Sequence, residues 1–310
     1  MKTNLFKIMG LFSLLGIIVL ACSKSDSSDL PSLTAEEIIL AQDDLAADDI
    51  FNDVDGSVQD QIQELEANGF QTTTLKSDDD EYTCLVVTVD YPDSTRFPKV
   101  ITLDYGTGCR VVYNGDTIFK EGKIIITLTD HFFNPGAQRI ITFEDFYVNE
   151  MKVEGLLTNT YVGPDENGMN EYNLKIEDGK LIFADEDGNR LEYTREADFT
   201  KLWDRADWPV EDTVYLDGSM WGVTVEGLNY SREIVETLVM VHCPGYGRRW
   251  VIVDGIVVST IGDSETTTDY SDGGCDGTAG IFPAGPMQRG PLHRIRIRMH
   301  HRYRHNGGNQ

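Results

Sequence analysis

The chain has 310 residues, 40% of them hydrophobic, and a formal net charge of −26 at pH 7. This is enough apolar material for one large or two medium folded domains. The charge is uneven: residues 22–280 hold 18 basic and 52 acidic side chains, a net charge of −34. Such an acidic body repels phosphate, which excludes a nucleic-acid-binding protein and argues against contact with bare anionic headgroups.

Residues 1–21 have the pattern of a secretory signal peptide. Lys2 and Lys7 give a positive start, and an apolar run follows from Ile8 to Leu20. This run has 13 residues, whereas a helix needs about 20 to span a bilayer. We therefore expect a targeting segment that is removed on export.

The run ends in Val19-Leu20-Ala21-Cys22, which resembles the lipobox of bacterial lipoproteins, although Leu20 stands where a small residue is usual. The resemblance implies cleavage before Cys22 and acylation of that cysteine. Two or three acyl chains on one residue hold a soluble domain at a membrane, which one chain does only weakly. The polar residues 22–33 predict a flexible tether. We expect an exported protein, anchored by lipid to the outer membrane, on its periplasmic face or at the cell surface.

Residues 34–69 are expected to form an acidic helical segment. Thr34-Ala-Glu-Glu37 is a capping-box pattern, and Asn68-Gly69 is a stop signal. Asp55-Gly56 predicts a break that divides the segment into two helices. Most positions between the apolar residues are acidic or Ala, so we expect solvated outer faces, with the helices packed on a sheet or forming an acidic stalk.

The hydrophobic period changes to two from residue 82, which predicts an antiparallel β body over residues 82–280. Asp178-Gly179, Asp187-Gly188 and Asp254-Gly255 are read as hairpin turns, and residues 147–157 as one strand. The fold class is all-β, an antiparallel meander preceded by the short helical segment. A curved sheet, a sandwich and a barrel remain open, as do two related halves, 82–200 and 201–280.

Four cysteines remain besides Cys22, an even number that suggests disulfides in an exported protein. A cysteine opens a β-rich segment at Cys84 and again at Cys243, and a Gly-Cys pair closes each segment at Cys109 and Cys275. A glycine turn before the second cysteine brings it beside the earlier strand. The repeat predicts the pairs Cys84–Cys109 and Cys243–Cys275, so that Cys243 is bridged and does not act as a nucleophile with His242.

Three strand segments, Lys120–Thr127, Thr142–Asn149 and Val153–Asn159, look like those of uncharacterised Bacteroidota outer-membrane lipoproteins, as do both Gly-Cys segments. The resemblance covers most of residues 82–280. It implies a secreted, lipidated β-protein without a known activity.

Residues 281–310 are unlike the rest, with six arginines, four histidines and no acid. Three interpretations are open: a frameshift near residue 280, a basic tail that docks on the acidic body, and metal capture by the histidines. The metal interpretation would use His300, His301 and His305.

The sequence contains no nucleophile elbow, zinc-protease motif, phosphate-binding loop or dinucleotide fingerprint, so we assign no catalytic residue, metal or cofactor. Calcium at Asp78–Glu81 or Asp185–Asn189 lacks the EF-hand spacing, and the second segment fits a hairpin turn. His131 is expected to be a packed or surface residue. Aromatic residues of β-proteins usually lie in the core, and a sugar-stacking platform is the alternative. That platform would use Trp203, Trp208, Trp221 and Trp250.

These observations favour a non-enzymatic, lipid-anchored envelope protein with a binding, adhesion or accessory role, whose partner is a glycan or a protein. One alternative is a secreted hydrolase that cleaves glycans with paired carboxylates. Another is a carrier that holds an apolar ligand in an internal cavity.

Overall fold

The chain divides into two units, Met1–Pro31 and Ser32–Gln310, and all described residues lie in the second. The predicted signal peptide, Cys22 and residues 23–32 of the tether lie outside the described residues. In the part of the chain that the structure describes, no helix has the length and apolar content to cross a bilayer. The computed structural model describes residues 33–70, 73–74, 84–91, 96–113, 116–185, 187–205, 212–243, 250–270, 274–275, 277–283 and 293–296.

One helix, α1 (Ala35–Ala67), precedes the sheet. Its capping box is formed as predicted: Thr34 accepts a hydrogen bond from the Glu37 backbone N–H at 3.1 Å, and its own N–H donates to the Glu37 carboxylate at 2.7 Å. The predicted break at Asp55-Gly56 is wrong, because the helix continues through both residues. A Cβ on Gly56 would lie 2.5 Å from Cδ1 of Trp250, so this glycine admits a close neighbour and does not end a helix.

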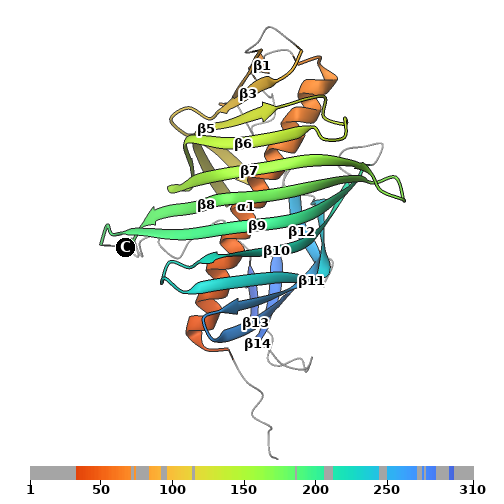
Figure 1. Cartoon of the computed structure of the whole chain (residues 1–310). Coiled ribbons are helices and arrows are strands. Elements are labelled where there is room, and N and C mark those ends of the chain that lie inside the picture. Colours follow the sequence, from red (N-terminus) through yellow and green to blue (C-terminus); the bar gives the residue numbers. More distant parts are fainter. Residues whose placement is uncertain are drawn as a thin grey trace, which may run out of the picture. The chain divides into compact units, whose positions relative to one another are not determined.

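The strands form one continuous, curved, antiparallel sheet whose order follows the chain, as Figure 1 shows, and the all-β meander is therefore confirmed. β4 lies off this path and pairs with the first part of β5, whose second part pairs with β3. β9 crosses the boundary between the two halves considered above. The fifteen described strands are β1 (Thr73–Thr74), β2 (Val86–Asp90), β3 (Lys99–Asp104), β4 (Cys109–Tyr113), β5 (Asp116–Leu128), β6 (Gln138–Val148), β7 (Met151–Pro164), β8 (Asn170–Ala184), β9 (Arg190–Asp204), β10 (Thr213–Val223), β11 (Asn229–His242), β12 (Trp250–Ile261), β13 (Ser264–Asp269), β14 (Thr278–Pro283) and β15 (His293–Arg296).

The two faces of the sheet have different environments. Along β8, Tyr172, Leu174 and Ile176 are buried, and the residues between them, such as Asn173 and Lys175, are exposed. This alternation is expected when one face packs on a core and the other meets solvent. The buried face packs on α1, which passes behind β6 to β11 in the view of Figure 1. We call this side the inner face and the opposite side the outer face.

Two Asp-Gly pairs that we read as hairpin turns lie inside strands instead. β8 continues through Asp178-Gly179 and β12 through Asp254-Gly255, with a shift of strand register at each. Gly255 has φ +112°, and a Cβ there would lie 2.6 Å from the carbonyl oxygen of Thr237. These pairs form bulges that bend long strands, because the positive φ that suits a hairpin turn also suits a bulge.

The hairpin prediction at Asp185–Asn189 is confirmed, because these residues connect β8 to β9. One carboxylate oxygen of Asp185 accepts hydrogen bonds from the backbone N–H groups of Asp187, at 3.0 Å, and Asn189, at 2.7 Å. The carboxylate therefore serves the turn, as a short acidic side chain often does.

The structure joins Cys84 to Cys109 and Cys243 to Cys275, the two pairs that the repeat predicts. The first bond ties the residues before β2 to the start of β4, and the second ties the end of β11 to the residues before β14. Each closes a local loop, of 25 and 32 residues.

The sheet extends beyond residue 280, where we expected the body to end. β14 continues to Pro283, with Ile281 fully buried, and β15 pairs with β14. Residues 284–292 and 297–310 lie outside the described residues, and so do His300, His301 and His305. The three interpretations of the basic segment stay predictions.

Candidate functional site

The structure separates the tryptophans of the predicted sugar platform. Trp203 and Trp250 are buried in the core, whereas 45% of Trp221 is exposed on the outer face. Trp208 and Asp78–Glu81 lie outside the described residues. His131 lies in the loop before β6, where its ring packs edge-on against Phe97. Among the described residues, no group of acidic, histidine or cysteine side chains could hold a metal ion.

The main unexpected feature is a set of charged side chains buried between α1 and the inner face. Four aspartates of α1 are at most 7% exposed, so the prediction of solvated outer faces is wrong for these positions. A charged side chain is almost never fully buried unless it is paired. Here the partners come from distant strands. The set comprises Asp44, Asp48, Asp53 and Asp55 of α1, and Lys120, Arg139, Arg195, Lys201 and Arg232 of the sheet.

The first group of this set surrounds Asp48. Its carboxylate forms ion pairs with Arg195 of β9 and, at 2.6 Å, with Arg232 of β11. Burial acts to raise the pKa of Asp48, but the two guanidinium groups outweigh it and hold the pKa below its ordinary value. Asp44, one turn earlier, accepts a hydrogen bond from the Tyr193 hydroxyl at 2.7 Å. Burial raises the pKa of Asp44 against the opposing effects of Arg232 and Tyr193.

The second group surrounds Asp55. Lys201 of β9 donates to Asp55 at 2.5 Å and to the side-chain carbonyl of Gln59 at 2.7 Å. Burial lowers the pKa of Lys201, while Lys201 and Arg139 together hold the pKa of Asp55 below its ordinary value against burial. Arg139 is 3.9 Å from Asp55, and its guanidinium lies over the ring of Phe132. A third pair joins Lys120 of β5 to Asp53 at 2.6 Å.

These ion pairs fix the rotation of α1 about its axis and its position along the inner face of the sheet. A shift of α1 by one residue would leave several charges buried without partners. Breaking one partner of such a pair costs about 3–5 kcal/mol. Each of the four aspartates has a cationic neighbour within the described structure. The set therefore has the features of a structural interface.

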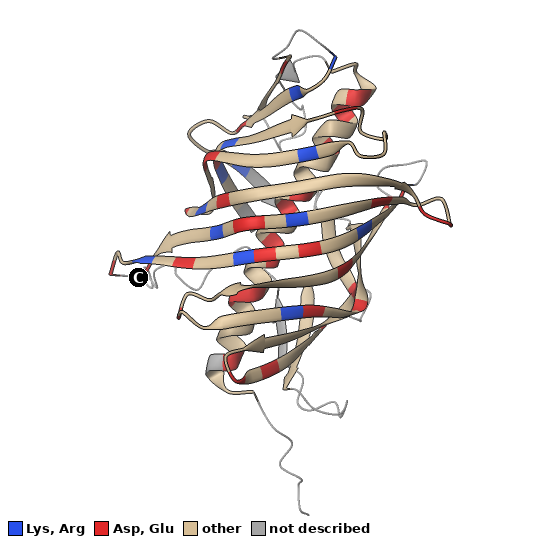
Figure 2. Ribbon diagram, viewed as in Figure 1, with Lys and Arg blue, Asp and Glu red and all other residues tan. Residues whose placement is uncertain are grey.

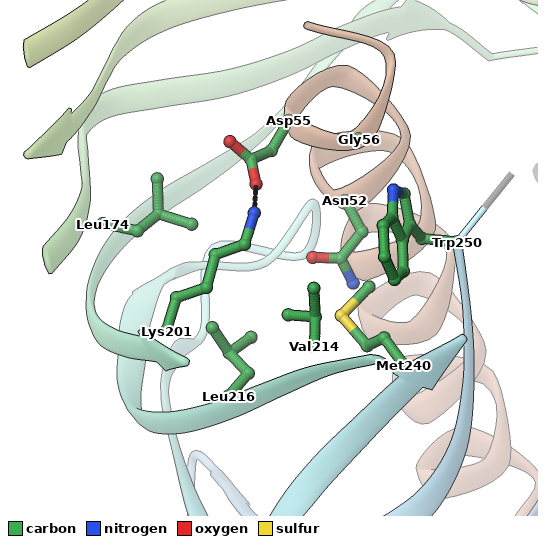
Figure 3. A pocket seen from close by; sticks show the side chains of 9 residues that line it. All are labelled: Asn52, Asp55, Gly56, Leu174, Lys201, Val214, Leu216, Met240 and Trp250. Atoms are coloured by element: carbon green, nitrogen blue, oxygen red, sulfur yellow. Dashed lines mark hydrogen bonds and ion pairs between the residues drawn. The ribbon is translucent and has the colours of Figure 1, made fainter. Parts of the chain in front are cut away.

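A small cavity of about 20 Å³ lies beside the Lys201–Asp55 pair (Figure 3). Asn52, Gly56 and Trp250 line it, together with apolar side chains of β8, β10 and β11. About 10–15 Å³ is needed for one water molecule, and pockets for small organic ligands measure about 300–1,000 Å³. This cavity can hold a single water molecule and is too small for a sugar or a lipid chain.

The outer face carries the exposed apolar side chains that interrupt its polar surface. On β10, Tyr215, Asp217, Ser219 and Trp221 alternate with buried residues and point outward. On β11, 52% of Val235 is exposed. These positions lie within the sheet and not at its end strands.

The strands of this part of the sheet carry more acidic than basic residues (Figure 2). Among the described residues of 212–283, the one lysine or arginine is Arg232, which is buried against α1. The acidic residues of this range are partly or fully exposed except Asp212, which accepts a hydrogen bond from the Trp203 indole. The exposed ones are Asp217, Glu226, Glu233, Glu236, Asp254, Asp263, Glu265 and Asp269.

No protein-family model, curated protein or solved structure matches the chain.

The buried ion pairs were missed at the sequence level, although two signals for them exist. In β9, Arg195 and Lys201 occupy the inward positions of an otherwise apolar alternation that includes Phe199 and Trp203. In α1, Asp44 and Asp48 are four residues apart and so share one side of the helix. A lysine or arginine at an inward strand position, together with aspartates on one side of a helix, indicates buried ion pairs. Neither pattern shows which aspartate pairs with which basic residue.

Proposed function

We propose that this protein is a lipid-anchored component of the cell envelope that binds a partner through the outer face of its sheet and has no enzymatic role. One observation carries the proposal: one face of the sheet is covered by α1, and the other face is accessible to a partner. The inner face is filled by α1 and its ion pairs, and the outer face presents Trp221 and Val235 within an acidic surface.

Two disulfides suggest an extracytoplasmic protein, because cytosolic thiols are kept reduced. Attachment to the membrane is inferred from the lipobox pattern at Val19–Cys22 and from the polar residues that follow it. A lipid anchor of this kind holds the folded unit close to the bilayer.

The two alternative functions receive less support. A glycan hydrolase needs two carboxylates facing a cleft, whereas the buried aspartates of α1 face cations. A carrier needs a ligand-sized apolar cavity, whereas the cavity beside Lys201, of about 20 Å³, has room for one water molecule. A binding face needs only an accessible surface with apolar anchors among polar groups, which the outer face supplies.

Site-specific photo-crosslinking in intact cells tests the proposal. A photoreactive residue at Ser231, which is exposed on the outer face of β11, should give a discrete higher-mass adduct. The same residue at Asn167, which is exposed in the turn between β7 and β8, serves as the control and should give little. Equal adducts from both positions, or none from Ser231, would contradict the proposal.

A further inference from the structure

Trp221 lies two residues before the end of β10, on the outer face, with carboxylates on both neighbouring strands. Its partners in the strand register are Glu196 of β9 and Ser231 of β11. The adjacent outward position of β10, Ser219, pairs with Asp198 and Glu233 in the same way. Side chains opposite each other on one face have Cβ atoms about 5 Å apart, and diagonal neighbours are about 7–8 Å apart. A group resting on the indole therefore comes within reach of three carboxylates.

The negative charge of this site is only partly compensated. Asp198 pairs with Lys175 at 3.2 Å, and Glu196 accepts the backbone N–H of Asp178 at 3.0 Å. Glu233 has no ion-pair partner in the described part of the chain. Arg232 of β11 points to the inner face, where it pairs with Asp44 and Asp48 of α1 and does not offset the charge of the outer face. The outer face of β10 and β11 thus keeps a net negative charge around an exposed indole.

An exposed indole surrounded by carboxylates favours the binding of a cation. The face of an indole ring attracts an ammonium or guanidinium group through its quadrupole, and neighbouring carboxylates strengthen that attraction. A neutral sugar would also stack on the ring, but it would gain nothing from the surrounding charge. The chemistry at Trp221 is complementary to lysine and arginine side chains.

A second apolar contact indicates that the ligand is longer than one side chain. Val235 is 52% exposed on β11, four residues beyond the register partner of Trp221. Four residues of extended chain span about 13 Å. A polypeptide segment that places a basic side chain on Trp221 can therefore place an apolar side chain, four positions away, on Val235.

We infer that the outer face around Trp221, Glu233 and Val235 binds an extended, basic polypeptide segment of a partner protein, with one arginine or lysine resting on the Trp221 indole. This inference rests on the proposed function and names the class of its partner. It assigns Trp221 as the cation contact, the carboxylates of Glu233 and Glu196 as the charge complement, and Val235 as the apolar contact.

The test is a titration of the full chain followed through the indole N–H resonance of Trp221, which the W221F variant identifies. The probe is the acetylated and amidated peptide Arg-Thr-Arg-Thr-Val-Thr-Arg-Thr-Arg, whose central valine is four positions from each terminal arginine. The matched control peptide has glutamine in place of every arginine. The basic peptide should shift the Trp221 resonance, and its affinity should fall with added salt, because the Debye length shortens from about 8 Å at physiological ionic strength.

Substitutions then assign the contacts, and isothermal titration calorimetry measures the affinity of every variant, because W221A lacks the reporting indole resonance. W221A should weaken binding about tenfold, which corresponds to about 1.4 kcal/mol, and E233Q and V235A should each weaken it severalfold. V162A is the matched control, because Val162 of β7 is exposed to the same 45% as Trp221 and lies away from the site. V162A should bind as the unsubstituted chain does.

Several results would overturn the inference. One is equal affinity for W221A and the unsubstituted chain, and another is equal affinity for the basic and the glutamine peptides. If a neutral oligosaccharide shifts the Trp221 resonance and the basic peptide does not, the face is a glycan site. If the peptide binds only after Arg298, Arg302 and Arg304 are changed to glutamine, the occupant is this chain's own basic segment. Failure of the peptide with a persisting photo-adduct at Ser231 rejects the partner class and leaves the proposed function standing.

Discussion

Replacing Asp48 by asparagine should destabilise the fold more than almost any other change of a single charge. Asp48 is buried and is the shared partner of Arg195 and Arg232. Removing one partner of a buried ion pair costs about 3–5 kcal/mol, because the remaining charges stay buried without compensation. Domains have a total stability of about 5–15 kcal/mol, so D48N should lose a large share of it.

Thermal and urea unfolding measure this loss. For a large domain, each 1 kcal/mol shifts the Tm by about 2–4 °C, so D48N should melt about 6–20 °C lower. The control is D198N on the outer face, where the Asp198–Lys175 pair is about half exposed. Exposed pairs contribute about 0–1 kcal/mol, so D198N should melt within a few degrees of the unsubstituted chain.

A double-mutant cycle separates the pair from other effects of the substitution. If Asp48 stabilises the fold through Arg232, then R232M should cost much less in the D48N background than alone. Additive losses, or a D48N variant as stable as D198N, would refute the reasoning that buried ion pairs hold α1 in the sheet.

The other predictions concern the helix contact, acid stability and a disulfide. G56A should destabilise the fold by about 1–3 kcal/mol in urea unfolding, because the new Cβ overlaps the indole beside it; a stabilised variant, as helix propensity alone predicts, would contradict the contact. The folded-state pKa values of Asp48 and Asp55 are lowered, so their stabilisation is present above the unfolded pKa of about 4 and is lost as pH falls through the folded values. Urea unfolding should therefore show that the unsubstituted chain loses stability below about pH 4 and that D48N loses less. An equal loss in D48N and the unsubstituted chain would contradict the contribution of Asp48 to acid sensitivity. Serine at both Cys243 and Cys275 should cost about 2–5 kcal/mol, and unchanged unfolding in the presence and absence of reductant would contradict the role of the bond.

Local signals in the sequence predicted much of the fold. The capping box at Thr34 and the turn at Asp185–Asn189 form as expected, because each depends on residues a few positions apart. Residues 147–157 do not form one strand, since Asn149 and Glu150 make a turn with positive φ between β6 and β7. Neither residue is a glycine, so the usual turn signal is missing there.

The nature of the core could not be read from the sequence in the same way. Acidic positions of α1 were expected to face water, and Asp44, Asp48, Asp53 and Asp55 are buried instead. Their partners lie far away in the chain, as Arg232 lies 184 residues from Asp48, and no local pattern reports such a separation. The site around Trp221 could not be predicted from local patterns either. Trp221 is one of four tryptophans in the sequence, and its place in the register of β10 distinguishes it from the buried Trp203 and Trp250.

The most direct test of the account is the intact mass of the protein purified from its native membrane, with and without reductant. We predict a chain that begins at an acylated Cys22 and gains four hydrogens when Cys84–Cys109 and Cys243–Cys275 are reduced. A chain without acyl mass would contradict the lipid anchor, and a mass that reductant leaves unchanged would contradict the two disulfides.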